Sequence, residues 1–416
     1  MAPPQQAPPP SESRRPRGSV SMLGAVALGL VILIAAGVML LFTAHRFAAR
    51  GAARAHHLET AQHHLDAALK LQPQNRALRF EAARIARRRG DFTGAASHLA
   101  AVEKRTPGAP DVQLEHRLLL AQRGELQDVE MGLKGLVSQG HPDAALIQEA
   151  LATGYLASGR LHDAQALLEE LLHKDASHTP ALLMLSQVFA SLGRDEESMP
   201  LLRRAVQADP ASSAAHLALA KALMLQGFER EAAGHFEWVQ SLRPHDPEVL
   251  LGLAEYRSNA GERDEAQRLI DDLLQHHKDH PGGLTERARL ALRRNQPVQA
   301  EELCRRALTA APTDAMAWQV MANALHAQGR AADAARALDN HAVFDGAAQQ
   351  LRYLAGELEE RPNDPDVLAK VGAAYLRLNQ PNQAEDYLQR ALSVDPENAT
   401  ARQLLQQMRR RGRMAR

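Results

Sequence analysis

The stretch Thr179–Ser212, which reads TPALLMLSQVFASLGRDEESMPLLRRAVQADPAS, decides the fold of this chain. In its first half, apolar residues return every three or four positions, as they do along one face of an α-helix. Gly193 follows, and glycine adopts most easily the left-handed turn that ends a helix. A second apolar stripe leads to Pro210, which stops a helix because proline has no amide hydrogen. The stretch therefore predicts two packed helices joined by a tight turn.

The same pattern continues on both sides with a period of 34 residues. Pro210 and Pro244 lie 34 residues apart, and two intervals of 68 residues hold Ala176 or Lys278 where the intermediate proline would stand. The interval from Pro312 to Pro362 is 50 residues, so we expect an extra helix around Ala347–Glu360 to break the regular stacking there. The boundary prolines are Pro73, Pro107, Pro142, Pro210, Pro244, Pro312, Pro362 and Pro396.

Composition favours helices throughout. Hydrophobic residues make up 45% of the chain and aromatic residues only 4%, and the apolar content is mostly Ala and Leu, which are strong helix formers. Small residues recur at equivalent positions, where they let neighbouring helices approach closely. These positions are Ala220, Ala232, Ala266, Ala300, Gly372 and Ala384.

The 34-residue period and its inner pattern resemble the tetratricopeptide repeat family over about residues 42–398, or close to nine or ten units. The resemblance implies an all-α protein, an α-solenoid of stacked helix-turn-helix repeats that forms a superhelix. It also implies that partner proteins bind in a groove lined by the first helix of each unit. The repeats occupy the chain without leaving 100 residues for a catalytic domain.

The chain divides into four parts. Residues 1–17 are rich in proline and small polar residues and are predicted to be disordered. Residues 18–44 are predicted to be a single transmembrane helix, residues 45–398 the repeat array, irregular at 313–364, and residues 399–416 a capping helix with a basic tail. The tail arginines are Arg409, Arg410, Arg411, Arg413 and Arg416.

The segment Val20–Phe42 is long and apolar enough to span a bilayer. A cleaved signal peptide is the alternative, but Phe42 stands where such a peptide needs a small residue. Three arginines precede the segment and three follow it, so the positive charge on the two sides is nearly equal and does not by itself decide the orientation in the membrane. A short tail with three arginines is hard to translocate, which places the N-terminus in the cytoplasm and the array outside it. Ser21, Ala25 and Gly29 offer a face for self-association of the anchor.

The charge and motif content argues against several functions. The chain has 49 basic and 49 acidic residues, so we expect no binding to nucleic acid. It contains no phosphate-binding glycine loop, no His-Glu-x-x-His and no Gly-x-Ser-x-Gly. We therefore predict no catalytic residue, no cofactor and no enzyme activity. Cys304, the only cysteine, falls on an apolar helix position and is predicted to be buried in the core.

Two groups of histidines stand out. His276 and His280 are four residues apart, a spacing that can hold a metal ion. Histidine near a helix C-terminus is also favoured by the helix dipole, and neither a cysteine nor a fixed carboxylate is evident beside them. We therefore predict no metal site. The two groups comprise His56, His57, His63 and His64, and His276, His277 and His280.

The resemblance places the ligand surface on the first helices. Its predicted groove residues pass from apolar to polar along the array. Chaperone-binding relatives hold a C-terminal carboxylate with a Lys/Asn/Arg clamp, whose parts are here dispersed over different units, so that ligand is not carried over. The asparagine ladder of glycan-transferring relatives is missing too. The groove residues are Leu183, Gln187, Leu217, Lys221, Met224, Leu225, Glu255, Arg289, Arg293 and Asn323, with Leu251, Asn259, Thr285, Gln319 and His326 beside them.

These features predict a membrane-tethered scaffold that binds partner peptides or proteins of unknown identity in the groove. The alternative is an assembly factor for envelope polysaccharide, pilus or secretion machinery. A metal-dependent enzyme that uses the histidines is a remote third hypothesis.

Overall fold

The computed structural model describes residues 22–54 and 57–414, and within these ranges it contains 21 helices and no strand. This confirms the prediction of an all-α protein. The predicted tail at residues 1–17, the first residues of the predicted anchor, Ser21, His56 and Arg416 lie outside the described residues.

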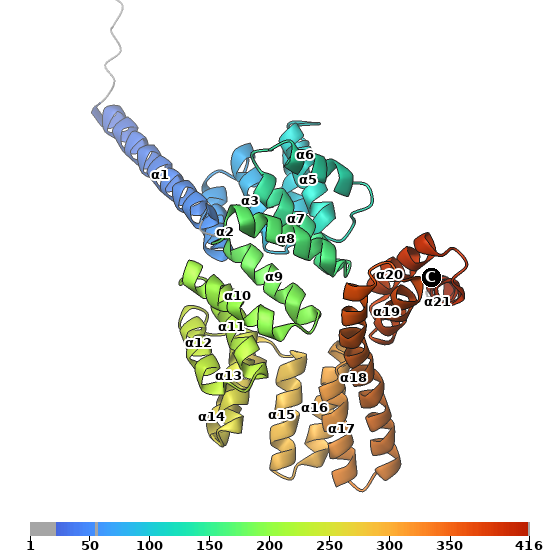
Figure 1. The fold of residues 1–416 in the computed structure, drawn as a ribbon. Coiled ribbons are helices and arrows are strands. Elements are labelled where there is room, and N and C mark those ends of the chain that lie inside the picture. The colour runs from blue at the N-terminus through green and yellow to red at the C-terminus, as the bar shows by residue number, and fades with distance from the viewer. Residues whose placement is uncertain (1–21, 55–56, 415–416) are drawn as a thin grey trace, which may run out of the picture.

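The helices follow one another as packed pairs that form a curved array (Figure 1). In the N-terminal half the helices are α1 (Met22–Arg54), α2 (Leu58–Leu71), α3 (Arg76–Arg88), α4 (Phe92–Glu103), α5 (Pro110–Gln122), α6 (Glu130–Ser138), α7 (Ala144–Ala157), α8 (Leu161–Lys174), α9 (Thr179–Ser191) and α10 (Asp195–Ala208). They continue as α11 (Ser213–Leu225), α12 (Glu229–Leu242), α13 (Pro247–Asn259), α14 (Arg263–His276), α15 (Pro281–Arg293), α16 (Pro297–Ala310), α17 (Ala315–Ala327), α18 (Ala331–Glu360), α19 (Pro365–Arg377), α20 (Pro381–Val394) and α21 (Ala399–Met414).

The repeat boundaries have local causes that the sequence shows. The carboxylates of Asp246 and Asp314 accept hydrogen bonds from the first backbone amides of α13 and α17, which satisfies donors that have no partner inside the helix. Gly193 ends the first helix of its unit with a φ of 73°, and Asn295 takes the equivalent place with a φ of 56°. Glycine and asparagine adopt this left-handed conformation most easily.

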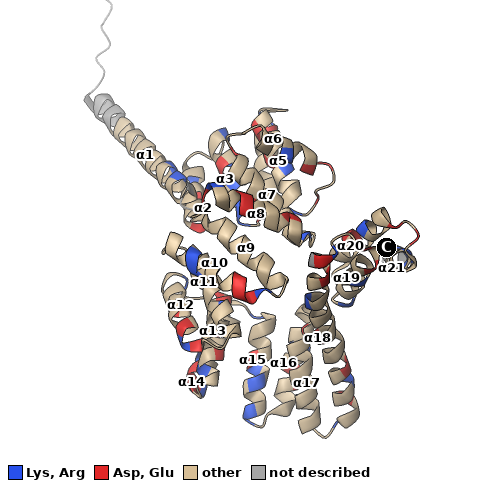
Figure 2. Cartoon of the chain, in the orientation of Figure 1, with Lys and Arg blue, Asp and Glu red and all other residues tan. Residues whose placement is uncertain are grey.

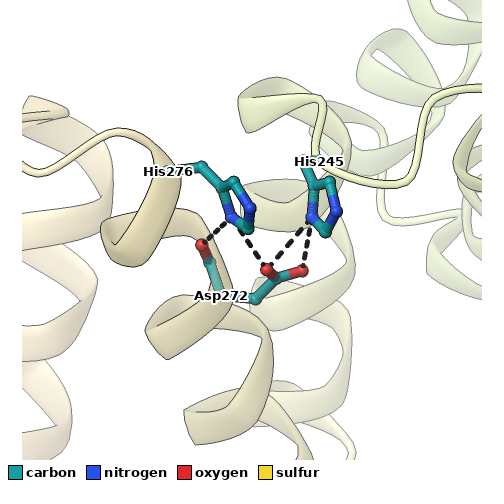
Figure 3. Close-up of side chains that lie close together, drawn as sticks. All are labelled: His245, Asp272 and His276. Carbon is teal, nitrogen blue, oxygen red and sulfur yellow. Dashed lines mark hydrogen bonds and ion pairs between the residues drawn. The ribbon is translucent and has the colours of Figure 1, made fainter.

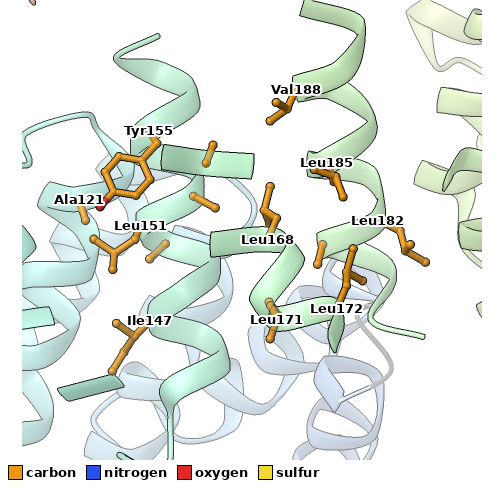
Figure 4. Packing of buried hydrophobic residues seen from close by; sticks show 14 of the residues in the cluster. Ala121, Ile147, Leu151, Tyr155, Leu168, Leu171, Leu172, Leu182, Leu185 and Val188 are labelled. Atoms are coloured by element: carbon orange, nitrogen blue, oxygen red, sulfur yellow. The ribbon is translucent and has the colours of Figure 1, made fainter. Parts of the chain in front are cut away.

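Successive pairs pack through clusters of buried apolar residues. One cluster extends from α5 through the following helices to α11 and includes Leu151, Tyr155, Leu168 and Leu182 (Figure 4). Ala232 has none of its surface exposed, as the spacing of small residues predicts. The prediction for Cys304 is also confirmed, because its side chain is fully buried.

The first helices of successive units contact one another directly. This holds for α7 and α9, α9 and α11, α11 and α13, α13 and α15, and α15 and α17. They therefore form one continuous layer of the solenoid, which carries the predicted groove residues.

Helix α1 contains 33 residues and continues from its apolar part into the first unit. The stretch Leu30–Ala53 contains an 18-residue window whose mean hydropathy is 2.0 and of which 6% is buried, and the stretch is long and apolar enough to cross a membrane. Its C-terminal end joins the array, where Phe42 and Ala49 pack in a core with residues of α2 and α3. In the coloured part of this helix, Figure 2 shows Lys and Arg only towards the end that joins the array.

The array is irregular at two places. The extra helix expected at 347–360 is not separate, because α18 runs without a break over 30 residues from Ala331 to Glu360. Gly346 lies inside this helix, and an interior glycine costs about 1 kcal/mol without ending a helix. Helix α6 has only nine residues, and α5 packs against α7 across it.

The long helix α18 carries the C-terminal units back to the N-terminal half (Figure 1). The hydroxyl of Tyr387 on α20 donates a hydrogen bond to the carbonyl oxygen of Gly159, in the loop between α7 and α8. A cavity of about 250 Å³ lies at this contact, lined from both sides by residues that include Leu192, Leu351 and Tyr375. The superhelix is therefore closed by contacts between distant repeats.

Candidate functional site

The predicted groove residues are distributed over five neighbouring first helices. Leu183 and Gln187 lie on α9, Leu217, Lys221, Met224 and Leu225 on α11, Glu255 on α13, Arg289 and Arg293 on α15, and Asn323 on α17. Because these helices contact one another in order, the residues belong to one layer. Which of them contact a partner stays a prediction.

The apolar members differ in exposure. Leu183, Leu217 and Met224 are partly buried because they pack against the core around Phe236. Leu225 is 90% exposed and is free to contact a partner. Gln187 lines the cavity beside Tyr387 and Gly159, so the closing contact lies at the apolar end of the predicted groove.

The polar members link consecutive units. The Lys221 ammonium lies 2.6 Å from the Glu248 carboxylate on α13. The Arg293 guanidinium donates a hydrogen bond of 2.7 Å to Oγ of Ser258, which is buried on α13. These contacts hold the positive charges at fixed positions along the layer.

Glu255, Glu286 and Arg289 form a charged cluster between α13 and α15. Burial raises the pKa of Glu255, the nearby Glu286 carboxylate raises it further, and Arg289 opposes both effects. Arg289 itself makes a 2.6 Å ion pair with Glu286. Glu255 thus lies near two other carboxylates, those of Glu286 and Glu229, as well as Arg289, and a cationic group from a partner would be stabilised beside it.

The remaining predicted positions give a mixed result. Asn323, Gln319 and His326 are exposed on α17. Asn259 is exposed and donates a 2.8 Å hydrogen bond to Glu229. The expectation that Thr285 projects into the groove is wrong, because its side chain is only 3% exposed.

A second group of polar residues, which the sequence did not suggest, lies between distant repeats. Glu130 of α6 accepts hydrogen bonds from Lys134 at 2.7 Å, Tyr155 at 2.8 Å and Arg160 at 2.6 Å. Burial opposes ionisation, but these three bonds lower the pKa of Glu130 to about 2. Glu130 and Arg160 line an open cavity of about 930 Å³ together with Asp386 of α20.

The histidines associate in a way that the sequence did not reveal. His276 meets Asp272, one turn earlier on α14, and His245 from the loop between α12 and α13 (Figure 3). A carboxylate therefore does accompany His276, and the i, i+4 spacing of Asp272 and His276 was the signal in the sequence that could have found it.

The other predicted histidines do not join this group. His280 accepts a hydrogen bond from the backbone amide of Gly283 and caps α15, and His277 contacts the backbone oxygen of His245. His64 pairs with His45 at 3.1 Å, and His57 with Asp209 at 3.3 Å.

Cys304 shows no sign of reactivity. Burial raises the pKa of its thiol to about 12, with smaller contributions from Asp314 and Glu301. A thiol of this kind is protonated at neutral pH and is a poor nucleophile.

Comparisons with known proteins identify the repeats. Family models described as tetratricopeptide repeat match residues 48–110, 155–222, 251–315 and 365–398, together more than half of the chain. Over 228 residues, 53% of the chain, it is 29% identical to cellulose synthase operon protein C of Xanthomonas axonopodis pv. citri, covering 15% of that protein. Over 275 residues, 59% of the chain, it is 26% identical to a CTR9 homologue of Arabidopsis thaliana, covering 25% of it. The matched segments are thus a quarter or less of these relatives' lengths.

Solved structures with a similar fold include the APC/C hetero-tetramer Cut9–Hcn1 and a repeat protein from Parabacteroides merdae. The first is 19% identical, with a TM-score of 0.44 over 84% of this chain and 58% of that chain. The second is 16% identical, with a TM-score of 0.38 over 69% of this chain and 99% of that chain.

Proposed function

The chain belongs to the tetratricopeptide repeat family, and we propose that it is a membrane-tethered scaffold that binds partner proteins along its first-helix layer. The observation that carries this proposal is the continuous row of first helices from α9 to α17, whose predicted groove residues are mainly apolar on α9 and α11 and polar or charged from α13 to α17. A partner segment that crosses several units would contact all of them. Solenoids of stacked repeats commonly use such extended surfaces for binding.

Helix α1 supports the tether. Its apolar side chains are exposed, among them Leu33 at 72% and Leu40 at 71%. A row of this size without a protein partner is unfavourable in water and favourable in lipid. In the proposed topology the N-terminus lies in the cytoplasm and the repeats lie outside it.

The chemistry of the layer defines the partner that fits. Leu225 offers apolar area at one end, Glu255 favours a cationic side chain, and Arg293 favours an acidic one. We propose that the partner is a peptide or helix with an apolar part followed by charges of both signs. A few such contacts usually contribute most of the affinity of an interface.

An assembly factor for envelope polysaccharide, pilus or secretion machinery is the second candidate. The 29% identity to a protein named for a cellulose synthase operon favours the polysaccharide form of this hypothesis. In that case the partner would be a component of a polysaccharide-exporting machine. If the partner is captured by crosslinking, its identity separates this candidate from a general scaffold.

A photocrosslinking experiment in intact cells tests the binding surface. A photoreactive amino acid is placed at Asn259, Gln319 or Asn323 on first helices, and at Gln267 or Arg268 on the second helix α14 as controls. Asn259, Gln319, Asn323 and Arg268 are exposed, and Gln267 is partly buried. The proposal predicts a discrete crosslinked protein from the first-helix positions alone. Crosslinks that arise only from α14 would contradict it.

A further inference from the structure

Three potential metal ligands from two repeats meet at one place in the array. His245 precedes α13, whereas Asp272 and His276 lie one turn apart at the end of α14 (Figure 3). Their ligand atoms all lie within 4.8 Å of one another. Nδ1 of His245 and Nδ1 of His276 each lie 3.1 Å from the same oxygen, Oδ1 of Asp272.

The distances between these ligand atoms are compatible with a metal site. Zinc binds imidazole nitrogen and carboxylate oxygen at about 2.0–2.2 Å, which leaves neighbouring ligand atoms about 3 Å apart. The two separations from the histidines to Oδ1 of Asp272, 3.1 Å each, have that size. The two imidazole rings are also stacked, with centroids 3.8 Å apart and planes inclined by 21°, so both present the same edge to the carboxylate.

The surrounding structure holds the three ligands in place. Asp246 caps α13 directly after His245, and the Arg243 guanidinium lies 3.1 Å from Asp246. Nε2 of His277 lies 3.2 Å from the backbone oxygen of His245 and ties the loop to the end of α14. The negative end of the α14 dipole lies here and favours a cation.

We propose that His245, Asp272 and His276 form a binding site for a divalent transition metal such as zinc. Two imidazoles and one carboxylate prefer zinc, nickel or copper, whereas magnesium and calcium prefer oxygen ligands alone. The side chains are 53%, 34% and 38% exposed, so water or a further ligand can complete the coordination. The bound ion would join the loop before α13 to the end of α14.

Isothermal titration calorimetry with zinc chloride tests this proposal on the full chain in detergent, after treatment with a chelator. The variants Asp272→Asn and His276→Asn remove one ligand each. Asp271→Asn is the matched control, because Asp271 is adjacent on α14 but pairs with Arg287 on α15. His173→Asn removes an exposed histidine elsewhere, at the end of α8.

The proposal predicts that the unaltered chain and both controls bind zinc, and that magnesium chloride gives no heat at this site. Either ligand variant should lose one equivalent of zinc per chain or bind it at least about tenfold more weakly, since even supporting residues contribute ten- to hundredfold to metal affinity. Circular dichroism checks that the variants keep their helices. Absence of zinc binding, or equal binding by Asp272→Asn and the unaltered chain, would overturn the proposal.

Discussion

The hydroxyl of Tyr387 donates a hydrogen bond to the carbonyl of Gly159, although 228 residues separate them in the chain. Gly159 has a φ of 70°, and a Cβ at this position would collide with the ring of Tyr387. Tyr387 is 3% exposed and stacks on Tyr375 with centroids 5.6 Å apart. The contact joins the last repeats to the N-terminal half of the array, beside the apolar end of the proposed binding surface.

Replacing Tyr387 with alanine should open the array. The change removes the hydrogen bond and leaves a cavity, and the loss of a large buried aromatic side chain costs about 3–5 kcal/mol. We expect a lower melting temperature and a larger radius of gyration in small-angle X-ray scattering. Tyr353→Ala on α18 is the control, because Tyr353 is 69% exposed. An unchanged radius for Tyr387→Ala would show that the contact does not close the superhelix.

Replacing Ala232 with leucine should destabilise the contact between helices of its unit. Ala232 is fully buried in the cluster with Phe236 and Leu219, and overpacking of this kind costs about 1–3 kcal/mol. Thermal unfolding measures the effect. The same substitution at Ala335, which is exposed on α18, should leave the melting temperature nearly unchanged. Equal melting temperatures for the two variants would mean that the repeat register is misplaced.

Acid should weaken the fold through Glu130. Its bonds to Arg160, Lys134 and Tyr155 lower its pKa from the ordinary value of 4.5 to about 2, against the opposing effect of burial. A lowered pKa in the folded state stabilises the fold above the unfolded value, and this stabilisation is lost as the pH falls from 4.5 towards 2. Glu130→Gln should therefore melt lower than the unaltered chain at pH 7, and the difference should shrink towards pH 2. A difference that grows on acidification would refute this role.

Much of the architecture could be predicted from the sequence because each repeat is locally determined. Gly193 and Asn295 mark helix ends through their backbone preference, and Ala232 marks a close helix contact through its size. The meeting of Tyr387 with Gly159 could not be predicted, since it depends on small rotations that accumulate over many repeats. The association of His245 with Asp272 was missed for a related reason, because it joins the loop of one repeat to the helix end of the next.

The membrane tether can be tested independently of binding. The segment Val20–Phe42 should keep the full chain in the membrane pellet after carbonate extraction, since its apolar length favours lipid over water. A variant that begins at residue 60 should enter the soluble fraction with mainly helical circular dichroism. Release of the full chain into the supernatant would contradict the tether, and a mature N-terminus after residue 44 would identify a cleaved signal peptide.

The most direct test of the account is partner recovery after charge reversal on α15. The variant Arg289→Glu/Arg293→Glu, with the anchor intact, is compared with Arg263→Glu/Arg268→Glu on the second helix α14 and with deletion of residues 409–416. Helicity is checked in each case. We predict that recovery of the crosslinked partner falls about tenfold or more for the α15 variant, because a few central contacts dominate such interfaces, and stays near that of the unaltered chain for the other two. Full recovery with the α15 variant, together with loss on deleting the basic tail, would contradict binding at the first-helix layer.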